Sequence, residues 1–130
     1  MTPADSGHRG EYLLIICHDD AFSPTEELLA RIAEWDRELQ RQGIRHSGNP
    51  LRPASEAMTV RVRGGAMQLT EGPFAKAPGQ MAAYELVECA SLEEAVVLAS
   101  KHPMAAAGTI EVRPVWEDLA EQNRRRSDRG

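Results

Sequence analysis

The sequence predicts an α+β domain with a ferredoxin-like arrangement, in which a four-stranded antiparallel sheet carries two helices on one face. The main observation is the order of its segments: strand, helix, strand, an inserted hairpin, then strand, helix, strand. A chain of 130 residues is long enough for one modest core and too short for two. Its hydrophobic fraction of 42% and charged fraction of 27% are those of an ordinary folded domain, which excludes wholesale disorder.

The first half of the domain begins with a strand over residues 11–18. Both of its alternating sets of side chains are apolar, which is typical of a strand covered on both faces. A helix follows, with Ser23 as its expected N-cap and Glu26 completing a capping box. Gly43 is expected to stop this helix, and residues 44–51 then form a polar edge strand. The apolar stripe of the helix follows from its helical spacing: Leu28, Ile32, Trp35 and Leu39.

The middle of the chain predicts a hairpin over residues 58–70. Its two-residue turn is Gly64–Gly65, because glycine readily adopts the positive φ angles that such turns require. A loop over residues 71–80 follows and contains two turn dipeptides. Apolar residues alternate with polar ones along both hairpin strands: Val60, Val62, Met67 and Leu69.

The second half repeats the strand–helix–strand order. A strand is expected over residues 81–88, and Ser91 then caps a helix with Glu94 in the capping-box position. Pro103 ends this helix, and residues 109–115 form the last strand. The buried stripe of the second helix is predicted from its apolar residues: Leu92, Ala95, Val96 and Ala99.

The domain is expected to span residues 11–116, between a flexible segment 1–10 and a polar tail 117–130 that begins with a short helix. The net charge of −5 argues against nucleic-acid binding. We expect a cytoplasmic protein without membrane contact, because the chain has neither a membrane-spanning apolar run nor a signal peptide. Cys17 and Cys89 lie in apolar strands and are expected to be free thiols.

Two helices on one face would leave the other face of the sheet bare. The first strand is predicted to be central and is apolar on both sides, so its second face needs a cover. A second copy of the sheet supplies this cover most simply, which predicts a homodimer through the open face. The alternative is a monomer in which residues 116–122 fold back over the sheet.

The segment LTEGPFA at residues 69–75 resembles the DGPF signature of the YCII-related family, with Glu71 where that family usually has Asp. Similar segments cover the domain from residue 11 to residue 115. The resemblance implies a bacterial dimeric α/β barrel, in which two ferredoxin-like sandwiches pair their sheets back to back. Most DGPF members have no assigned activity, and several are encoded beside, or fused to, extracytoplasmic-function sigma factors.

The resemblance does not transfer a catalytic pair. YCII proteins have a His early in the first helix and an Asp just before the proline that follows the second helix. This chain has Glu26 and Glu27 in the first region and His102 before Pro103. It also departs from the DGPF branch at residues 75–80, where a Pro-Gly turn replaces a charged loop.

The last strand carries the best candidates for a polar cavity. Glu111 and Arg113 share the side that a dimer would cover, and Glu85 on a neighbouring strand is expected to join them. Enclosed charges are costly unless they are paired, so these residues either bind a polar ligand or form an ion-pair network at the interface.

Other candidates have both a functional and a structural interpretation. Glu71 and Phe74 beside a rigid Gly-Pro turn either line a ligand cleft or serve the fold, with Phe74 filling the core. His102 is either an acid/base group or a cation that stabilises the end of the second helix. His46 is expected to reach the cavity from an edge strand.

No metal or cofactor site is predicted. His18, Asp19 and Asp20 are adjacent, so on an extended chain they point to opposite sides and do not converge on an ion. The leading hypothesis is a homodimer that binds a small polar organic molecule and performs cofactor-free acid/base chemistry. Its catalytic candidates are Glu71, Glu111 and His102, and its ligand-binding candidates are Glu71, Phe74, Glu85, Glu111 and Arg113. The alternative is a non-catalytic regulatory protein that acts with a sigma factor, so enzymatic activity is left open.

Overall fold

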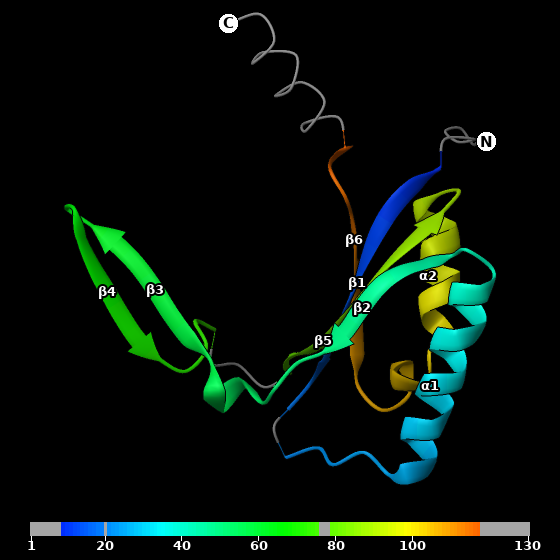
Figure 1. Ribbon diagram of the computed structural model, residues 1–130, viewed down its shortest axis with the longest axis horizontal. Coiled ribbons are helices and arrows are strands. Elements are labelled where there is room, and N and C mark those ends of the chain that lie inside the picture. Colours follow the sequence, from blue (N-terminus) through cyan, green and yellow to red (C-terminus); the bar gives the residue numbers. More distant parts are fainter. Residues whose placement is uncertain (1–8, 20, 76–78, 118–130) are drawn as a thin grey trace, which may run out of the picture.

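The computed structural model describes residues 9–19, 21–75 and 79–117 of the chain. Its main sheet has the strand order β2-β5-β1-β6, and each neighbouring pair is antiparallel (Figure 1). This is the order of a ferredoxin-like sandwich, so the predicted fold class is confirmed. The strands of this sheet are β1 (Gly10–His18), β2 (Arg45–Pro50), β5 (Gln80–Cys89) and β6 (Thr109–Pro114).

The two helices, α1 (Glu26–Arg41) and α2 (Leu92–Ser100), cover one face of the sheet (Figure 1). We call this the inner face and the opposite one the open face. The core lies between the inner face and α2, where Ala95 and Ala99 are buried. The strands contribute the remaining buried members of the core: Tyr12, Leu14, Val87 and Cys89. Cys17 and Cys89 are both free, and burial raises the pKa of the Cys89 thiol to about 11.

The start of α1 differs from the prediction. Thr25, rather than Ser23, is the N-cap, and its hydroxyl oxygen accepts a hydrogen bond from the backbone N–H of Leu28 at 3.1 Å. This start places Glu26 and Glu27 in the first turn, where carboxylates are stabilised by the exposed N–H groups of the helix. The predicted stop is confirmed, since Gly43 follows the helix with a φ of 77°.

The cap of α2 is as predicted, because the Ser91 hydroxyl accepts from the N–H of Glu94 at 3.1 Å. Its predicted apolar stripe is partly wrong. Leu92 and Val96 are 42% and 50% exposed, although Ala95 and Ala99 are buried. Small side chains four residues apart let the helix approach the sheet closely, and this contact is too narrow to cover the larger apolar side chains beside it.

Strand β2 contains a bulge that places its residues on both faces of the sheet. Arg45 pairs with Val87 and Ser47 with the adjacent Leu86, so His46 is an extra residue in β2. Arg45 points toward α1, whereas His46 contacts carboxylates on the open face. Gly48 then lies on the inner side, where an added Cβ would be 2.7 Å from the backbone oxygen of Tyr84.

The predicted hairpin is present as a separate two-stranded sheet of β3 (Met58–Arg63) and β4 (Ala66–Glu71). Gly64 and Gly65 form its turn with φ angles of 58° and 79°, as a two-residue hairpin turn requires. The hairpin projects from the body on the side away from the helices (Figure 1). In the described ranges, two single-turn 3₁₀ helices complete the fold, η1 (Ala54–Glu56) before β3 and η2 (Pro103–Ala105) after α2.

The ends of the chain are only partly covered by the structure. Trp116 is 70% exposed, and the rest of the predicted fold-back segment lies beyond residue 117, outside the described residues. Within the described ranges, none of the helices has the length and apolar character needed to cross a membrane.

Candidate functional site

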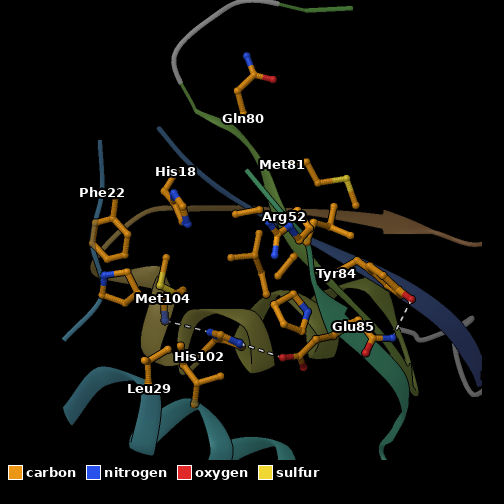
Figure 2. Close-up of a pocket in the computed structure, with 18 of the residues that line it drawn as sticks. His18, Phe22, Leu29, Arg52, Gln80, Met81, Tyr84, Glu85, His102 and Met104 are labelled. Atoms are coloured by element: carbon orange, nitrogen blue, oxygen red, sulfur yellow. Dashed lines mark hydrogen bonds and ion pairs between the residues drawn. The ribbon is translucent and has the colours of Figure 1, made fainter. Parts of the chain in front are cut away.

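A cavity of about 420 Å³ lies between α1 and the inner face of the sheet (Figure 2). Most of its wall is apolar, with side chains from both helical and strand elements. One part of the wall holds a polar cluster, in which Asp36 of α1 and Glu85 of β5 meet Arg45 and His102. Other polar residues line the cavity elsewhere: His18, Asn49, Arg52, Gln80 and Tyr84. The principal apolar lining residues are Ile16, Phe22, Leu29, Ile32, Met81 and Met104.

Glu85 is the centre of this polar cluster and is only 3% exposed. The indole N–H of Trp35 donates to its Oε1 at 3.3 Å, and His102 Nε2 lies 3.1 Å from its Oε2. Arg45 adds a positive charge, with its Nε 3.7 Å from Glu85 Oε1. A buried carboxylate with several donors and a nearby cation is stabilised in its ionised form.

His102 is held in one tautomer by its surroundings. The backbone N–H of Met104 donates to His102 Nδ1 at 2.9 Å, so that nitrogen carries no proton. Nε2 therefore carries the proton of the neutral ring and donates it to Glu85 (Figure 2). His102 follows α2 as the N-cap of η2, and its ring is only 2% exposed, so it is not a solvated group at the end of the helix.

Asp36 and Glu85 have pKa values shifted in opposite directions. Burial, a hydrogen bond with Glu85 and the repulsion of that carboxylate raise the pKa of Asp36 to about 6, against the attraction of Arg45. Burial alone would raise the pKa of Glu85, but hydrogen bonds from His102, Asp36 and Trp35 outweigh it and lower that pKa. Asp36 is therefore the carboxyl group of this pair that binds a proton first as the pH falls.

One oxygen of Asp36 is poorly satisfied. Among the described residues, Asp36 Oδ1 and Arg45 Nε are buried without a hydrogen bond, although they lie 3.4 Å apart as an ion pair. The Asp36 side chain also lines the cavity. A ligand with a hydrogen-bond donor would supply the partner that this oxygen lacks.

A second cluster of imidazole and carboxylates lies on the open face. His46 Nδ1 is 3.0 Å from Glu11 Oε2, and its Nε2 is 3.1 Å from Glu88 Oε1. Arg9 also contacts Glu88, with its Nε 2.9 Å from Oε2. The bulge in β2 places the His46 side chain on the open face, the face of Glu111 and Arg113 where its cavity was predicted, and not beside the cavity under α1.

Glu111 and Arg113 lie together on the open face, as their spacing predicts. They form an ion pair of 3.3 Å between side chains that are 55% and 67% exposed. Glu85 does not join them, contrary to the prediction. It pairs across the sheet with Leu14, whose side chain is buried on the inner face, whereas Glu111 pairs with Ile15.

Glu71 and Phe74 lie away from the cavity, near the base of the hairpin. Glu71 is the last residue of β4 and is exposed. Phe74 is 71% exposed, so the interpretation that it fills the core is wrong. The guanidinium of Arg61 instead lies 4.6 Å from the centre of its ring.

The first strand ends beside the cavity. The His18 ring lines it and lies 4.8 Å from the ring of Phe22 (Figure 2). Asp19 accepts a hydrogen bond from the N–H of Ala21 at 3.0 Å, while Asp20 falls outside the described residues. In the described part of the chain, no three His, Cys, Asp or Glu residues lie close enough together to hold a metal ion.

Sequence reasoning missed Asp36 and Arg45. Asp36 follows Ile32 by four residues and Leu28 by eight, so it lies on the same face of the helix as the apolar stripe. A carboxylate on the predicted buried side of a helix indicates a polar site, so Asp36 could have been identified from the sequence. Arg45 gave no such signal, because only the pairing with β5 and the bulge decide which face it occupies.

The fold and this cluster define a ferredoxin-like α+β domain with a partly buried carboxylate and imidazole site beside an apolar cavity. The model of the YCII-related domain matches residues 11–118, and the chain therefore belongs to the YCII-related family. An uncharacterised protein of Rhizobium meliloti (strain 1021) is 37% identical over 65 residues, or 48% of this chain. The match spans about half of that relative, 52% of its length.

Proposed function

We propose that the protein binds a small, mainly apolar organic molecule in the cavity and exchanges a proton with it without a cofactor. The observation that carries this proposal is the position of two carboxyl groups, Asp36 and Glu85, together in the wall of a mainly apolar cavity of about 420 Å³. An acid/base group works best when its pKa lies near the operating pH, and the pKa of Asp36 is about 6.

The chemistry assigned to these residues is a proton transfer without redox change. The ionised Asp36 carboxylate takes a proton from the ligand, and the resulting acid returns it to a different ligand atom. Glu85 and His102 are positioning residues, because their mutual hydrogen bond fixes the charge beside Asp36. The apolar wall keeps water away from the ligand and strengthens these electrostatic effects.

Ligand binding is tested by a thermal-shift screen with lactones, phenols and small organic acids. Binding to the folded state alone stabilises it by about 2.7 kcal/mol at a hundredfold excess over Kd. Asp36→Asn should reduce the shift, whereas Glu34→Gln, an exposed carboxylate on the same helix, should not. A folded protein that responds to no compound would contradict the proposal and favour the regulatory role with a sigma factor.

Proton exchange is tested separately in D₂O with each compound that binds. We expect deuterium to replace hydrogen at an acidic C–H position of the bound compound, and NMR measures this exchange. The rate should rise as the pH passes 6, because the ionised form of Asp36 is the base. Binding with no deuterium uptake above that of Asp36→Asn would reduce the protein to a binding module.

We also propose that the active form is a cytoplasmic homodimer through the open face, as in the DGPF branch that residues 69–75 resemble. The support is the open face itself, where apolar side chains are only partly covered within one chain: Leu13, Ile15 and Leu86. Sedimentation equilibrium tests this assembly, and a mass that stays at 14.3 kDa at every concentration would contradict it.

A further inference from the structure

The hairpin of β3 and β4, residues 58–71, presents an apolar face to solvent; we call it the arm. Cross-strand pairing places Val60 opposite Leu69 and Val62 opposite Met67, so these side chains share one face. Each is more than half exposed, from 57% for Leu69 to 67% for Met67. The opposite face is polar, with Arg61 opposite Gln68.

An arm of this kind requires a partner. A two-stranded hairpin is at best marginally stable when it packs against nothing, and contiguous apolar surface of this kind marks an interaction site. The hydrogen bonds around its base are local, from Gly72 N–H to the Ala57 carbonyl and from the Thr59 hydroxyl to the Gly72 carbonyl. Figure 1 shows the arm extending away from the sheet and the helices.

The open face is the second apolar surface without a cover in one chain. Leu13 and Leu86 lie opposite each other on its two central strands, β1 and β5. Ile15 continues this apolar strip beside Tyr84. Strands of six residues span about 20 Å, so the arm is long enough to lie across most of this strip.

We propose that the apolar face of the arm docks on the open face of a second copy of this chain, and that two copies exchange arms around a twofold axis. This inference rests on the proposed homodimer and names the element that covers its interface. One twofold contact buries both apolar surfaces of each chain, whereas a different partner would have to match the arm and the open face separately.

Charge favours the same occupant. The arm carries Arg61, Arg63 and Glu71, which give it a net charge of +1. Because the whole chain has a net charge of −5, the remainder of the chain has a net charge of −6. A second copy therefore offers an acidic body to a basic arm. Arg61 and Arg63 lie on the polar face of the arm, so they stay in water when the apolar face is buried, and their attraction to the acidic body acts at longer range.

The test compares two variants of equal charge by sedimentation equilibrium of the full chain. Val62→Lys with Met67→Lys places two cations on the apolar face of the arm, and Gln68→Lys with Thr70→Lys places them on its polar face. The first variant should weaken dimerisation by about 100-fold or more and the second by less than about threefold. If the first does not fold by circular dichroism, Val60→Ala with Leu69→Ala takes its place.

A mixing experiment locates the docking surface. Leu13→Lys alters the open face and should also weaken the homodimer. Mixed with the arm variant, it should form a heterodimer, because one intact arm then meets one intact open face. The absence of this heterodimer would overturn the arm exchange.

The same measurements separate this inference from the proposed dimer. A monomer for Leu13→Lys with an unchanged dimer for the arm variant would overturn the arm exchange and leave a sheet-to-sheet dimer. A native chain that is monomeric at every concentration would overturn both and assign the arm to a different partner.

Discussion

The two faces of the main sheet carry the same chemical groups in different surroundings. On the inner face, the His102 side chain is 0% and the Glu85 side chain 4% exposed. On the open face, His46 and its partners Glu11 and Glu88 are each about one-third exposed, with values from 32% to 35%. Both clusters join an imidazole to a carboxylate at 3.0 to 3.1 Å, so burial is their main difference.

This difference determines what each cluster can do. On the inner face, Met104 fixes the tautomer of His102, and the burial of Glu85 makes each of its donors necessary. On the open face, His46 has a carboxylate at both nitrogens and donates to both only when both carry a proton. Water screens the charges of the open-face cluster. We therefore expect the inner cluster to stabilise the fold, and the ion pairs of the open-face cluster to weaken as the salt concentration rises.

The sharpest test of the comparison removes one carboxylate from each face. Glu85→Ala leaves the donors of Trp35 and His102 buried without an acceptor and should lower the free energy of unfolding by about 3 to 5 kcal/mol. Glu88→Ala, compared in the monomeric Leu13→Lys variant, should have a much smaller effect, because water already solvates its partners in the single chain. Urea unfolding at pH 7 measures both, and equal losses would contradict the distinction.

The next test uses pH. The pKa of Asp36 is about 6 in the folded state and near 3.8 in the unfolded chain, so the folded state binds its proton more tightly. Its contribution is fully present below pH 3.8 and is lost as the pH rises through 6. The stability of the native protein relative to Asp36→Asn should therefore fall by about 2 to 3 kcal/mol between pH 3.5 and 7.

Urea unfolding of both proteins across this pH range measures the Asp36 contribution, since the other titrating groups are common to both. Stability that rises with pH relative to the variant would contradict the raised pKa. Glu34→Gln is the matched control, because its side chain is 73% exposed and its difference from the native protein should not change with pH.

The smallest effect is expected on the open face. In the monomeric Leu13→Lys variant, whose open face is uncovered, His46→Ala should change the free energy of unfolding by no more than about 1 kcal/mol, because partly exposed ion pairs contribute little. The change should shrink further in 0.5 M NaCl, which screens solvent-exposed charges. A loss in this monomer as large as that of Glu85→Ala would contradict the difference between the two faces.

The elements were predictable from sequence because their signals are local. Alternation predicted the hairpin, Gly64–Gly65 its turn and Ser91 the cap of α2. The N-cap of α1 was predicted wrongly because Ser23 and Thr25 both satisfy the local rule, and only the position of the first turn distinguishes them.

The candidate site was less predictable because it depends on the pairing of distant strands. Alternation along β5 places Glu85 with Val87 but does not say which face that set occupies, and its pairing with the buried Leu14 decides it. His102 was a candidate, but its partner is 17 residues away on another element. Only Asp36 gave a local signal, as a carboxylate on the apolar side of its helix.

Because of the bulge in β2, the deletion of one residue would remove the open-face cluster and leave the inner cluster in place. His46 is the extra residue between Arg45 and Ser47, and these two already pair with adjacent positions of β5. Deletion of residue 46 would leave a regular strand in which Arg45 and Gly48 keep their places on the inner side. Such a deletion would remove the imidazole from the open face without disturbing the groups around the cavity, so a gap in an alignment at this position marks the loss of one cluster rather than a misfolded strand.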